Sequence, residues 1–388
     1  MSGPRHDVIV VGAGPAGAVA AEALGRAGRR VLIIERETLP RAKTCGGGVT
    51  YKVAQALGVD LAPVAERTIA TVELQWRMQR STTMPVHGPL VYMIQRSRFD
   101  AWLTQRALAT GQVELKDGLA VKSIDIDARG VTVRSAHDSF QADYLIGADG
   151  AAGPVARSLG LMQVRHLLPA TEQDIAVDAA TMDRWQDRMA LDIGTLHGSY
   201  GWVFPKADHL NVGVGCFSTR ARSAKQLKDY GRRHLAWQLP GPHRVLRTVG
   251  FVLPLRPVGA AIQRGRALLA GDAAGLVEAF TGEGIHWAVR SGQIAARAIV
   301  DHQMSGAAGE LGYEQAIDAE LMPTLIDARR WAHIYLWWPR ACYALPTRSP
   351  RFWSAVAKIV RGERDYTDVR RRLGVAGRVA DWLPVAME

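Results

Sequence analysis

The pattern of hydrophobic and polar positions predicts a strand–helix–strand unit at the start of the chain. Residues 7–11 (DVIVV) and 31–35 (VLIIE) are short runs rich in β-branched residues, and the stretch between them is rich in alanine up to about residue 27. Continuous apolar runs of this length are typical of strands buried in a parallel sheet. We therefore predict a βαβ unit here.

The middle of the chain is richer in short predicted strands. Strands are predicted at 69–76, 90–95, 112–116, 119–126, 130–134 and 141–146, with a helix at 98–110. A second strand-rich block spans about 171–262 with a helix near 223–237, and a long helix from 284 to about 303 follows it. This order is typical of an α/β fold in which a β-rich substrate domain is inserted into a discontinuous Rossmann-type domain. The expected boundaries are 1–70, 96–165 and 263–330 for the Rossmann-type domain, 71–95 and 166–262 for the β-rich domain, and 331–388 for a C-terminal helical segment.

The C-terminal segment combines aromatic and basic residues. Its tryptophans and cations are Trp331, Trp337, Trp338, Trp353, Trp382, Arg340, Arg348, Arg351, Lys358, Arg361 and Arg364. Pro339, Pro346 and Pro350 are expected to break it into short pieces. Two interpretations stay open: a helical cap that packs on the cofactor domain, or a peripheral platform that binds an anionic membrane, because tryptophan prefers the interface and arginine attracts anionic headgroups.

Composition narrows the list of partners. The 388 residues carry a formal charge of +11, which favours anionic partners, but no nucleic-acid-binding signature is present and nucleic acid is not expected. The three cysteines are too widely spaced for a disulfide framework or a metal site, so we expect no metal and a reducing cytoplasm. No apolar stretch reaches the roughly 18 residues of a membrane span. The expected location is the cytoplasm, with association at the cytoplasmic membrane face left open by the C-terminal segment.

The glycine-rich turn after the first predicted strand carries the strongest motif. Gly12, Gly14 and Gly17 form a G-x-G-x-x-G that follows a strand, opens a helix and precedes Glu35 at the end of the second strand. In this context the glycines allow a tight turn, close approach of a pyrophosphate and close helix packing, and the acidic residue binds ribose hydroxyls. The candidate cofactor-binding residues of this unit are Gly12, Gly14, Ala16, Gly17, Glu35 and Arg36.

Later segments distinguish between NAD and FAD. No second G-x-G-x-x-G occurs, and residues 144–150 (YLIGADG), 268–275 (LLAGDAAG) and 96–100 (RSRFD) resemble the signatures of the p-hydroxybenzoate-hydroxylase-like flavoproteins. The resemblance implies FAD as the cofactor, with the helix that follows the GD segment directed at the isoalloxazine. It implies cofactor contacts at Arg96, Ala120, Val121, Asp149, Asp272, Gly282, Gly284 and Ile285.

Two more segments resemble the geranylgeranyl reductase family. Residues 40–48 (PRAKTCGGG) are similar to its CGG segment, and residues 200–206 (YGWVFPK) to its P-x-x-Y-x-W-x-F-P signature, with His197 in place of the first proline. The resemblance covers about residues 5–300 and implies reduction of isoprenoid double bonds. It places Cys45, Gly46 and Gly48 at the flavin. On a strand, Tyr200, Trp202 and Phe204 share one face and can line an apolar substrate slot.

The implied reaction is the saturation of an isolated double bond in a polyprenyl (geranylgeranyl) chain. Because no carbonyl is conjugated to the bond, we expect protonation to lead and hydride from the reduced flavin to follow. The candidate catalytic residues are Cys45, Tyr200 and Trp202: the Tyr200 and Trp202 rings to stabilise positive charge, and Cys45 or Tyr200 to donate the proton. NAD(P)H, or a reduced ferredoxin or small reductase, is the expected electron donor. An FAD-dependent monooxygenase of the hydroxylase or halogenase type on the same fold is the alternative.

Overall fold

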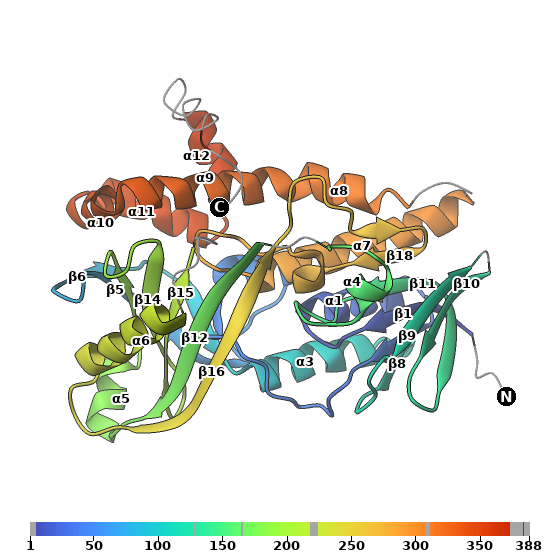
Figure 1. Cartoon of the computed structure of the whole chain (residues 1–388), viewed down its shortest axis with the longest axis horizontal. Coiled ribbons are helices and arrows are strands. Elements are labelled where there is room, and N and C mark those ends of the chain that lie inside the picture. Colours follow the sequence, from blue (N-terminus) through green and yellow to red (C-terminus); the bar gives the residue numbers. More distant parts are fainter. Residues whose placement is uncertain are drawn as a thin grey trace.

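Three β-sheets organise the structure, a computed structural model that describes residues 5–127, 129–163, 166–217, 224–306, 311–372 and 383. The two larger sheets lie side by side along the long axis (Figure 1). This first sheet has the order β17-β18-β11-β1-β2-β8, with β9 and β10 attached through β11. Its strands are β1 (His6–Val11), β2 (Val31–Ile34), β8 (Val113–Lys116), β9 (Ser123–Asp127), β10 (Gly130–Arg134), β11 (Ser139–Gly147), β17 (Gln263–Arg264) and β18 (Ala267–Leu269).

The predicted βαβ unit forms the centre of this sheet. β1 pairs in parallel with β2 and with β11, and residues Val8–Val11 and Val31–Ile34 are buried on both faces. Helix α1 (Pro15–Arg26) begins after Gly14 with Pro15 in its first turn and packs against α3 (Arg96–Leu108) and α7 (Ile285–Ser305). Because the sheet draws its strands from separated parts of the chain, the discontinuous Rossmann-type fold class is confirmed; the domain boundaries stay a prediction.

The second sheet has seven strands in the order β16-β12-β15-β14-β13-β5-β6. These are β5 (Thr71–Trp76), β6 (Arg80–Pro85), β12 (His166–Ala176), β13 (Arg188–Ile193), β14 (Ser199–Pro205), β15 (Leu210–Cys216) and β16 (Arg244–Leu255). Helix α6 (Ala224–Gln238) covers one face, where Tyr230 and His234 lie against Gly201, and α5 (Ala179–Trp185) lies near the end of the sheet. The third sheet joins β3 (Gly48–Thr50), β7 (Val91–Ile94) and β4 (Ala65–Ile69), with α2 (Tyr51–Leu57) after β3.

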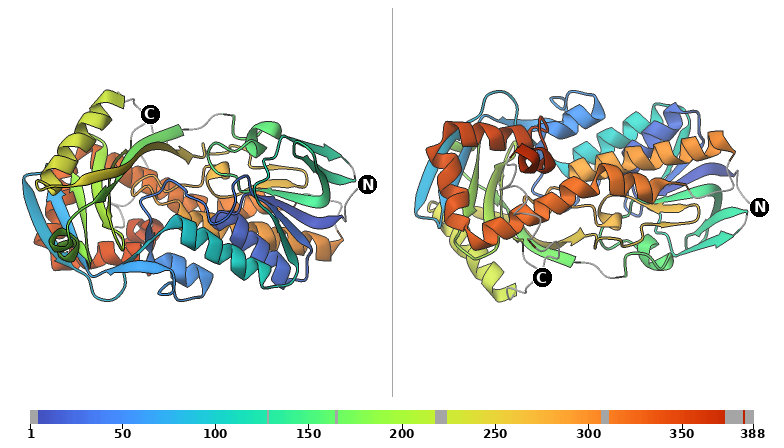
Figure 2. Two further views of the ribbon diagram at one scale, coloured as in Figure 1. Left: turned by 90° about the horizontal axis from the view of Figure 1, so that it is seen from below. Right: turned by 90° about the horizontal axis from the view of Figure 1, so that it is seen from above.

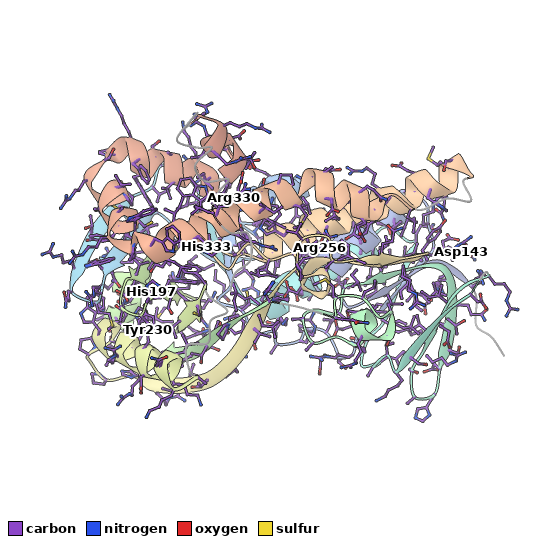
Figure 3. The ribbon with its side chains drawn as sticks, turned by 45° about the horizontal axis from the view of Figure 1, so that its top comes forward. Asp143, His197, Tyr230, Arg256, Arg330 and His333 are labelled. Carbon is purple, nitrogen blue, oxygen red and sulfur yellow. The ribbon has the colours of Figure 1, made fainter. Side chains whose placement is uncertain are left out.

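Helices at the C-terminal end lie across both larger sheets (Figure 2). They are α8 (Tyr313–Glu320), α9 (Met322–Trp337), α10 (Pro339–Arg348), α11 (Pro350–Val360) and α12 (Tyr366–Arg372). Arg256, at the end of β16, lies in the middle of the molecule (Figure 3) and is fully buried. Its guanidinium donates to Ala260 O at 2.8 Å and to Asp318 of α8 at 2.5 Å, so one buried cation ties the seven-stranded sheet to these helices.

The structure corrects several boundaries. The predicted strand 69–76 is two strands, because the chain leaves the three-stranded sheet after Ile69 and enters the seven-stranded sheet at Thr71. The predicted strand 119–126 begins only at Ser123, so Ala120 and Val121 lie in the preceding loop. Pro346 lies inside α10 instead of ending a helix.

The helical C-terminal segment packs against the seven-stranded sheet through α10 and α11. Trp353 Nε1 donates to Pro85 O at 2.9 Å, and the Tyr343 ring lies 5.7 Å from that of Trp76. Trp382 lies outside the described residues. No helix in the described part of the chain is both long and apolar enough to span a membrane.

Candidate active site

The glycine turn after β1 tolerates no side chain at two positions. Gly12 has φ +105°, and a Cβ on it would lie 2.4 Å from Ala148 O; a Cβ on Gly17 would lie 2.0 Å from Gly12 O. Both contacts are with backbone atoms, which cannot move aside. The turn therefore brings the first N–H groups of α1 to the open end of the sheet, where they can bind an anion.

Two arginines stand beside this helix start. A Cβ on Gly14 would be 3.8 Å from an Arg41 nitrogen and 4.0 Å from an Arg96 nitrogen. Fully buried Asp100 holds both, with Arg96 at 2.8 and 2.9 Å and Arg41 at 3.0 Å. Burial by itself would lower the pKa of Arg96, but the Asp100 carboxylate outweighs it and the pKa is raised. The two fixed cations and the helix N-terminus fit a pyrophosphate. Arg41 was not predicted from the sequence, because it is far from Asp100 along the chain and no motif connects the two residues.

Glu35 is buried at the end of β2. Its carboxylate accepts the N–H of Ala13 at 2.8 Å and that of Glu37 at 3.2 Å. The N–H of Leu119 donates to Glu35 O at 2.9 Å, so the loop with Ala120 and Val121 starts beside it. This places all three next to the glycine turn, as an adenosine site needs. The Arg36 side chain is two-thirds exposed and pairs with Glu37 at 3.4 Å, and its contact with a cofactor stays a prediction.

The start of α7 reaches the same region. Gly282 has φ +73°, Gly284 is the N-cap, and a Cβ on Gly284 would lie 3.2 Å from Asp272 Oδ1. Ile285 is the first helical residue and is buried. Asp272 lies in the short 3₁₀ helix η1 (Gly271–Ala274) that follows β18, so the GD segment and the helix start are in contact.

Two other predicted cofactor residues have clear structural roles. The backbone of Ala16 packs under α7, since a Cβ on Gly292 would lie 2.4 Å from Ala16 O. Asp149 Oδ2 accepts the N–H of Val155 at 2.8 Å and so holds the start of α4 (Val155–Ser158). Their contacts with a cofactor stay predictions.

The aromatic residues of β14 face the glycine loop after Cys45. Tyr200, Trp202 and Phe204 share the face opposite α6, with ring centroids 5.6 and 6.1 Å apart. A Cβ on Gly46 would lie 3.1 Å from Phe204 and 3.2 Å from Trp202 Nε1, and one on Gly48 would lie 3.1 Å from Phe204. The structure thus brings together the two segments that carry the predicted catalytic and substrate-binding residues.

The two predicted proton donors differ in their surroundings. The Tyr200 hydroxyl donates to Thr281 O at 3.0 Å, and burial, followed by the charges near it, raises its pKa. A phenol held in this way releases a proton less readily than a free one. Cys45 Sγ accepts the N–H of Gly47 at 3.4 Å, and its backbone N–H donates to Glu172 at 3.1 Å. Cys45 therefore lies against a carboxyl group that the sequence did not single out.

A buried lysine under the glycine loop also escaped sequence reasoning. Lys206 is 2% exposed, and its ammonium donates to Gly46 O at 2.6 Å and to Ile94 O at 3.0 Å. Burial lowers its pKa to about 8, although Cys45 and nearby carboxylates oppose this. A charge here fixes the backbone of the loop from behind. The only feature of the sequence that points to Lys206 as a site residue is its position directly after the YGWVFP segment.

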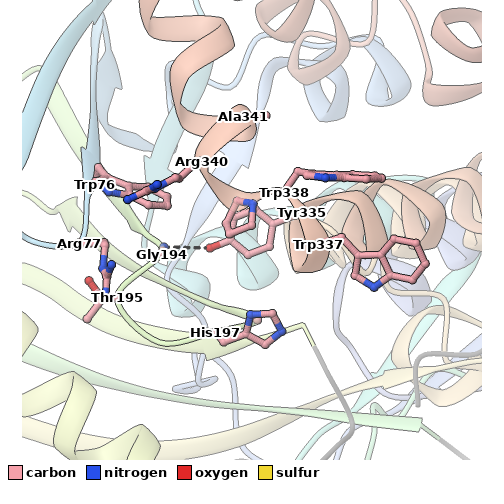
Figure 4. A pocket seen from close by; sticks show the side chains of 12 residues that line it. Trp76, Arg77, Gly194, Thr195, His197, Tyr335, Trp337, Trp338, Arg340 and Ala341 are labelled. Carbon is pink, nitrogen blue, oxygen red and sulfur yellow. Dashed lines mark hydrogen bonds between the residues drawn. The ribbon is translucent and has the colours of Figure 1, made fainter.

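A cavity of about 570 Å³ opens near the turn between α9 and α10 (Figure 4). Its lining residues are Trp76, Arg77, Gly194, Thr195, His197, Gly198, Tyr335, Trp337, Trp338, Pro339, Arg340 and Ala341. Tyr335 connects it to the aromatic face: the Phe217 ring lies 5.1 Å from Tyr335 and 4.9 Å from Tyr200. A wall of aromatic rings therefore runs from the cavity toward the glycine loop.

Comparison with known proteins agrees with this geometry. Residues 5–315 match the model of the FAD binding domain family. Chloroplastic geranylgeranyl diphosphate reductase of Oryza sativa subsp. japonica is 29% identical over 326 residues (79% of this chain, 68% of that protein). Menaquinone reductase of Mycobacterium tuberculosis is 32% identical over 319 residues (75% of each).

Two solved structures show the same fold. A geranylgeranyl bacteriochlorophyll reductase-like protein from Thermoplasma acidophilum has a TM-score of 0.75 at 22% identity, over 85% of this chain and 87% of that one. A flavin-dependent brominase has a TM-score of 0.71 at 17% identity, over 92% and 94%. At these identities the likeness establishes the fold alone, which both kinds of enzyme share.

Proposed function

Because the chain belongs to the FAD binding domain family and is an FAD-dependent oxidoreductase, we propose that it saturates isolated double bonds of a geranylgeranyl or other polyprenyl chain. The observation that carries the proposal is the aromatic face of Tyr200, Trp202 and Phe204 against the Cys45–Gly48 loop. Relatives named geranylgeranyl diphosphate reductase and digeranylgeranylglycerophospholipid reductase support it.

The residues of the Rossmann-type end fit FAD, since the glycine turn leaves room for a pyrophosphate beside Arg41 and Arg96. When bound, reduced FAD supplies a hydride. The chain binds the adenosine end through Glu35 and orients the reactive end with the Cys45–Gly48 loop and the start of α7. Trp202, 4% exposed, helps exclude water and turns a π face toward positive charge that develops on the substrate.

The prenyl chain would lie along the wall that joins Tyr200, Phe217 and Tyr335 to the cavity of Figure 4. Such a wall suits an apolar chain, whose burial is favourable by roughly 25 cal/mol per Å². Arg77 and Arg340 at the cavity suit the anionic end of a prenyl substrate.

The test is reduction of a geranylgeranyl substrate by the purified, flavin-loaded protein with dithionite or NADPH, in the presence and absence of air. We expect products that have gained pairs of hydrogen atoms, seen by mass spectrometry, with no requirement for oxygen. Incorporation of oxygen, found only in air, would instead establish the monooxygenase alternative. Bleaching of the flavin absorbance by NADPH or NADH, in contrast to reduced ferredoxin, would identify the electron donor.

We also propose that the α9–α10 turn binds an anionic membrane. Trp337 and Trp338 are 59% and 56% exposed beside Arg340. Tryptophan side chains favour the membrane–water interface, and arginine attracts anionic headgroups. Replacing both tryptophans with serine should abolish sedimentation with phosphatidylserine vesicles and leave the flavin content unchanged. Truncation at residue 331 would be a poor test, because Ala332 and Tyr335 are buried in the core. Unchanged sedimentation of the double variant would overturn the proposal.

A further inference from the structure

Glu172 lies on β12, next to the edge strand β16 of the seven-stranded sheet, on the face that carries Trp202. It is directly opposite Gly213 on β15, and Gly213 is opposite Trp202 on β14. A Cβ on Gly213 would lie 2.1 Å from the Trp202 ring, so the indole extends over Gly213 toward Glu172. The indole N–H donates to Asn211 at 2.8 Å, which fixes the ring there. Glu172 is thus part of the wall of the predicted reaction site.

One oxygen of this carboxyl group has no hydrogen-bond partner in the described part of the chain. Glu172 is 1% exposed; Oε1 accepts the N–H of Cys45 at 3.1 Å and lies 3.6 Å from Arg247. Oε2 is buried without a partner among the described residues. A buried, unsatisfied carboxylate oxygen is costly, whereas the same oxygen carrying a proton costs much less.

The charged groups around Glu172 set its protonation. Burial is the largest influence and raises its pKa, and the neighbouring Asp174 carboxylate raises it further. The N–H of Cys45, Arg247 from β16 and Lys206 from the loop after β14 lower it, but the net pKa is raised. Burial would also raise the pKa of Asp174, but its partners His209, Asn211 and Arg247 outweigh this and lower it, so Asp174 stays anionic and favours the neutral form of Glu172.

We propose that the Glu172 carboxyl group donates the proton when the double bond is reduced, an inference that rests on the proposed function. Saturation of one double bond needs a proton on one carbon and a hydride on the other; the proton leaves Glu172 Oε2 and the hydride comes from reduced flavin. Glu172 is left as a carboxylate, beside Arg247, and regains a proton from solvent after each turnover. The chain of His209 and Asp208, 2.7 Å apart with Asp208 largely exposed, connects the Asp174 side of the cluster to solvent.

The test compares Glu172→Gln with two other carboxyl-to-amide variants. Glutamine keeps the shape and the acceptor for Cys45 N–H but cannot act as an acid. In a single turnover with prereduced flavin and a geranylgeranyl substrate, we expect it to lower the rate by about a hundredfold or more. Reduction of the flavin by dithionite should be unchanged. Asp174→Asn removes the like charge and should move the pH limit of the activity to lower pH.

The matched control is Glu73→Gln, because Glu73 lies on the α6 face of the same sheet and pairs with Arg188 at 2.8 Å. It should leave the turnover rate unchanged. An activity-independent readout is the infrared C=O band of a protonated carboxyl group, recorded on the unreacted protein. A component of this band should be lost in Glu172→Gln and persist in Glu73→Gln; the buried Glu278, whose pKa burial also raises, can contribute the remainder.

The outcomes separate the two proposals. If the wild-type protein reduces the substrate and Glu172→Gln retains more than about a tenth of the rate, or if the infrared band is the same in both, the role of Glu172 is refuted and the reductase function stands. If the wild type binds flavin but reduces no prenyl substrate, the proposed function itself is overturned, whatever the infrared spectrum shows.

Discussion

The glycine turn of the Rossmann-type sheet and the aromatic face of the seven-stranded sheet both bound the predicted flavin site, but they are built differently. The turn is made mostly of backbone, because Gly12 and Gly17 pack within a few ångströms of main-chain atoms. Its carboxylate, Glu35, comes from the end of the same βαβ unit and accepts a hydrogen bond from the turn. The aromatic face is made of side chains from β14, with two buried titratable groups beside it, Glu172 of β12 and Lys206 after β14.

The difference teaches what each region can tolerate. A site built from tightly packed backbone is lost when a side chain is added at a glycine such as Gly12 or Gly17, because the main-chain atoms in contact with it cannot move aside. A site built from buried charges fails gradually and with a dependence on pH, because each charge is balanced by its neighbours. The following changes test this contrast.

Gly17→Ala should have the largest effect. Its Cβ would lie 2.0 Å from Gly12 O, so α1 must move away from β1 and the pyrophosphate site is lost. We expect a protein that retains almost no flavin and whose free energy of unfolding is lower by several kcal/mol. Flavin absorbance and thermal unfolding measure this. Gly241→Ala is the control, because no atom lies within 4 Å of the added carbon. Wild-type flavin content in Gly17→Ala would contradict the account.

Lys206→Met should reveal the charge behind the aromatic face. A lysine whose pKa falls to about 8 on folding, from an ordinary 10.5, binds its proton less tightly when folded. The free energy of unfolding of the wild type should therefore rise with pH between about 8 and 10.5, by up to about 3 kcal/mol relative to the variant. Urea unfolding of both proteins across this pH range measures the difference. Parallel curves would show that Lys206 titrates normally.

The two regions also differ in how far the sequence could predict them. The turn was predictable because Gly12, Gly14, Gly17 and Glu35 lie within one short segment whose spacing has a physical meaning. The place of Glu172 beside Trp202 depends on the register of β15 against both β12 and β14, which no local pattern encodes. Period-two alternation correctly predicted that Tyr200, Trp202 and Phe204 share one face. It could not predict which face of the sheet this is or which loop the three side chains meet.

The same reasoning explains the remaining differences at longer range. The strand predicted at 69–76 is a continuous segment without glycine or proline, and nothing in its composition marks the change of sheet at Ala70. The cavity of Figure 4 arises where the α9–α10 turn meets the loop between β13 and β14, segments that are far apart in the sequence. Tertiary contacts of this kind are set by packing rather than by propensity.

Gly213→Ala should have an intermediate effect confined to the aromatic face. The added carbon would lie 2.1 Å from the Trp202 ring, so the indole must move and lose its hydrogen bond with Asn211, while no backbone atom has to shift and the fold persists. We expect destabilisation of about 1–3 kcal/mol, normal flavin content and a changed KM or kcat for the prenyl substrate. Steady-state kinetics and Trp fluorescence report it. Loss of flavin would mean that the two regions are coupled more tightly than their separate construction suggests.

Arg36→Ala should have the smallest effect, although the sequence placed this residue at the cofactor beside Glu35. Its side chain is two-thirds exposed and its pair with Glu37 is on the surface, so its loss should change stability and flavin affinity by less than about 1 kcal/mol. Arg41→Ala is the comparison, because the Arg41 side chain is largely buried between Glu35 and Asp100 and its removal takes a cation away from both carboxylates. Flavin release, followed by fluorescence, should be markedly faster in Arg41→Ala and nearly normal in Arg36→Ala. Equal losses would show that the surface arginine does reach the cofactor, and the turn would then depend on side chains as well as on backbone.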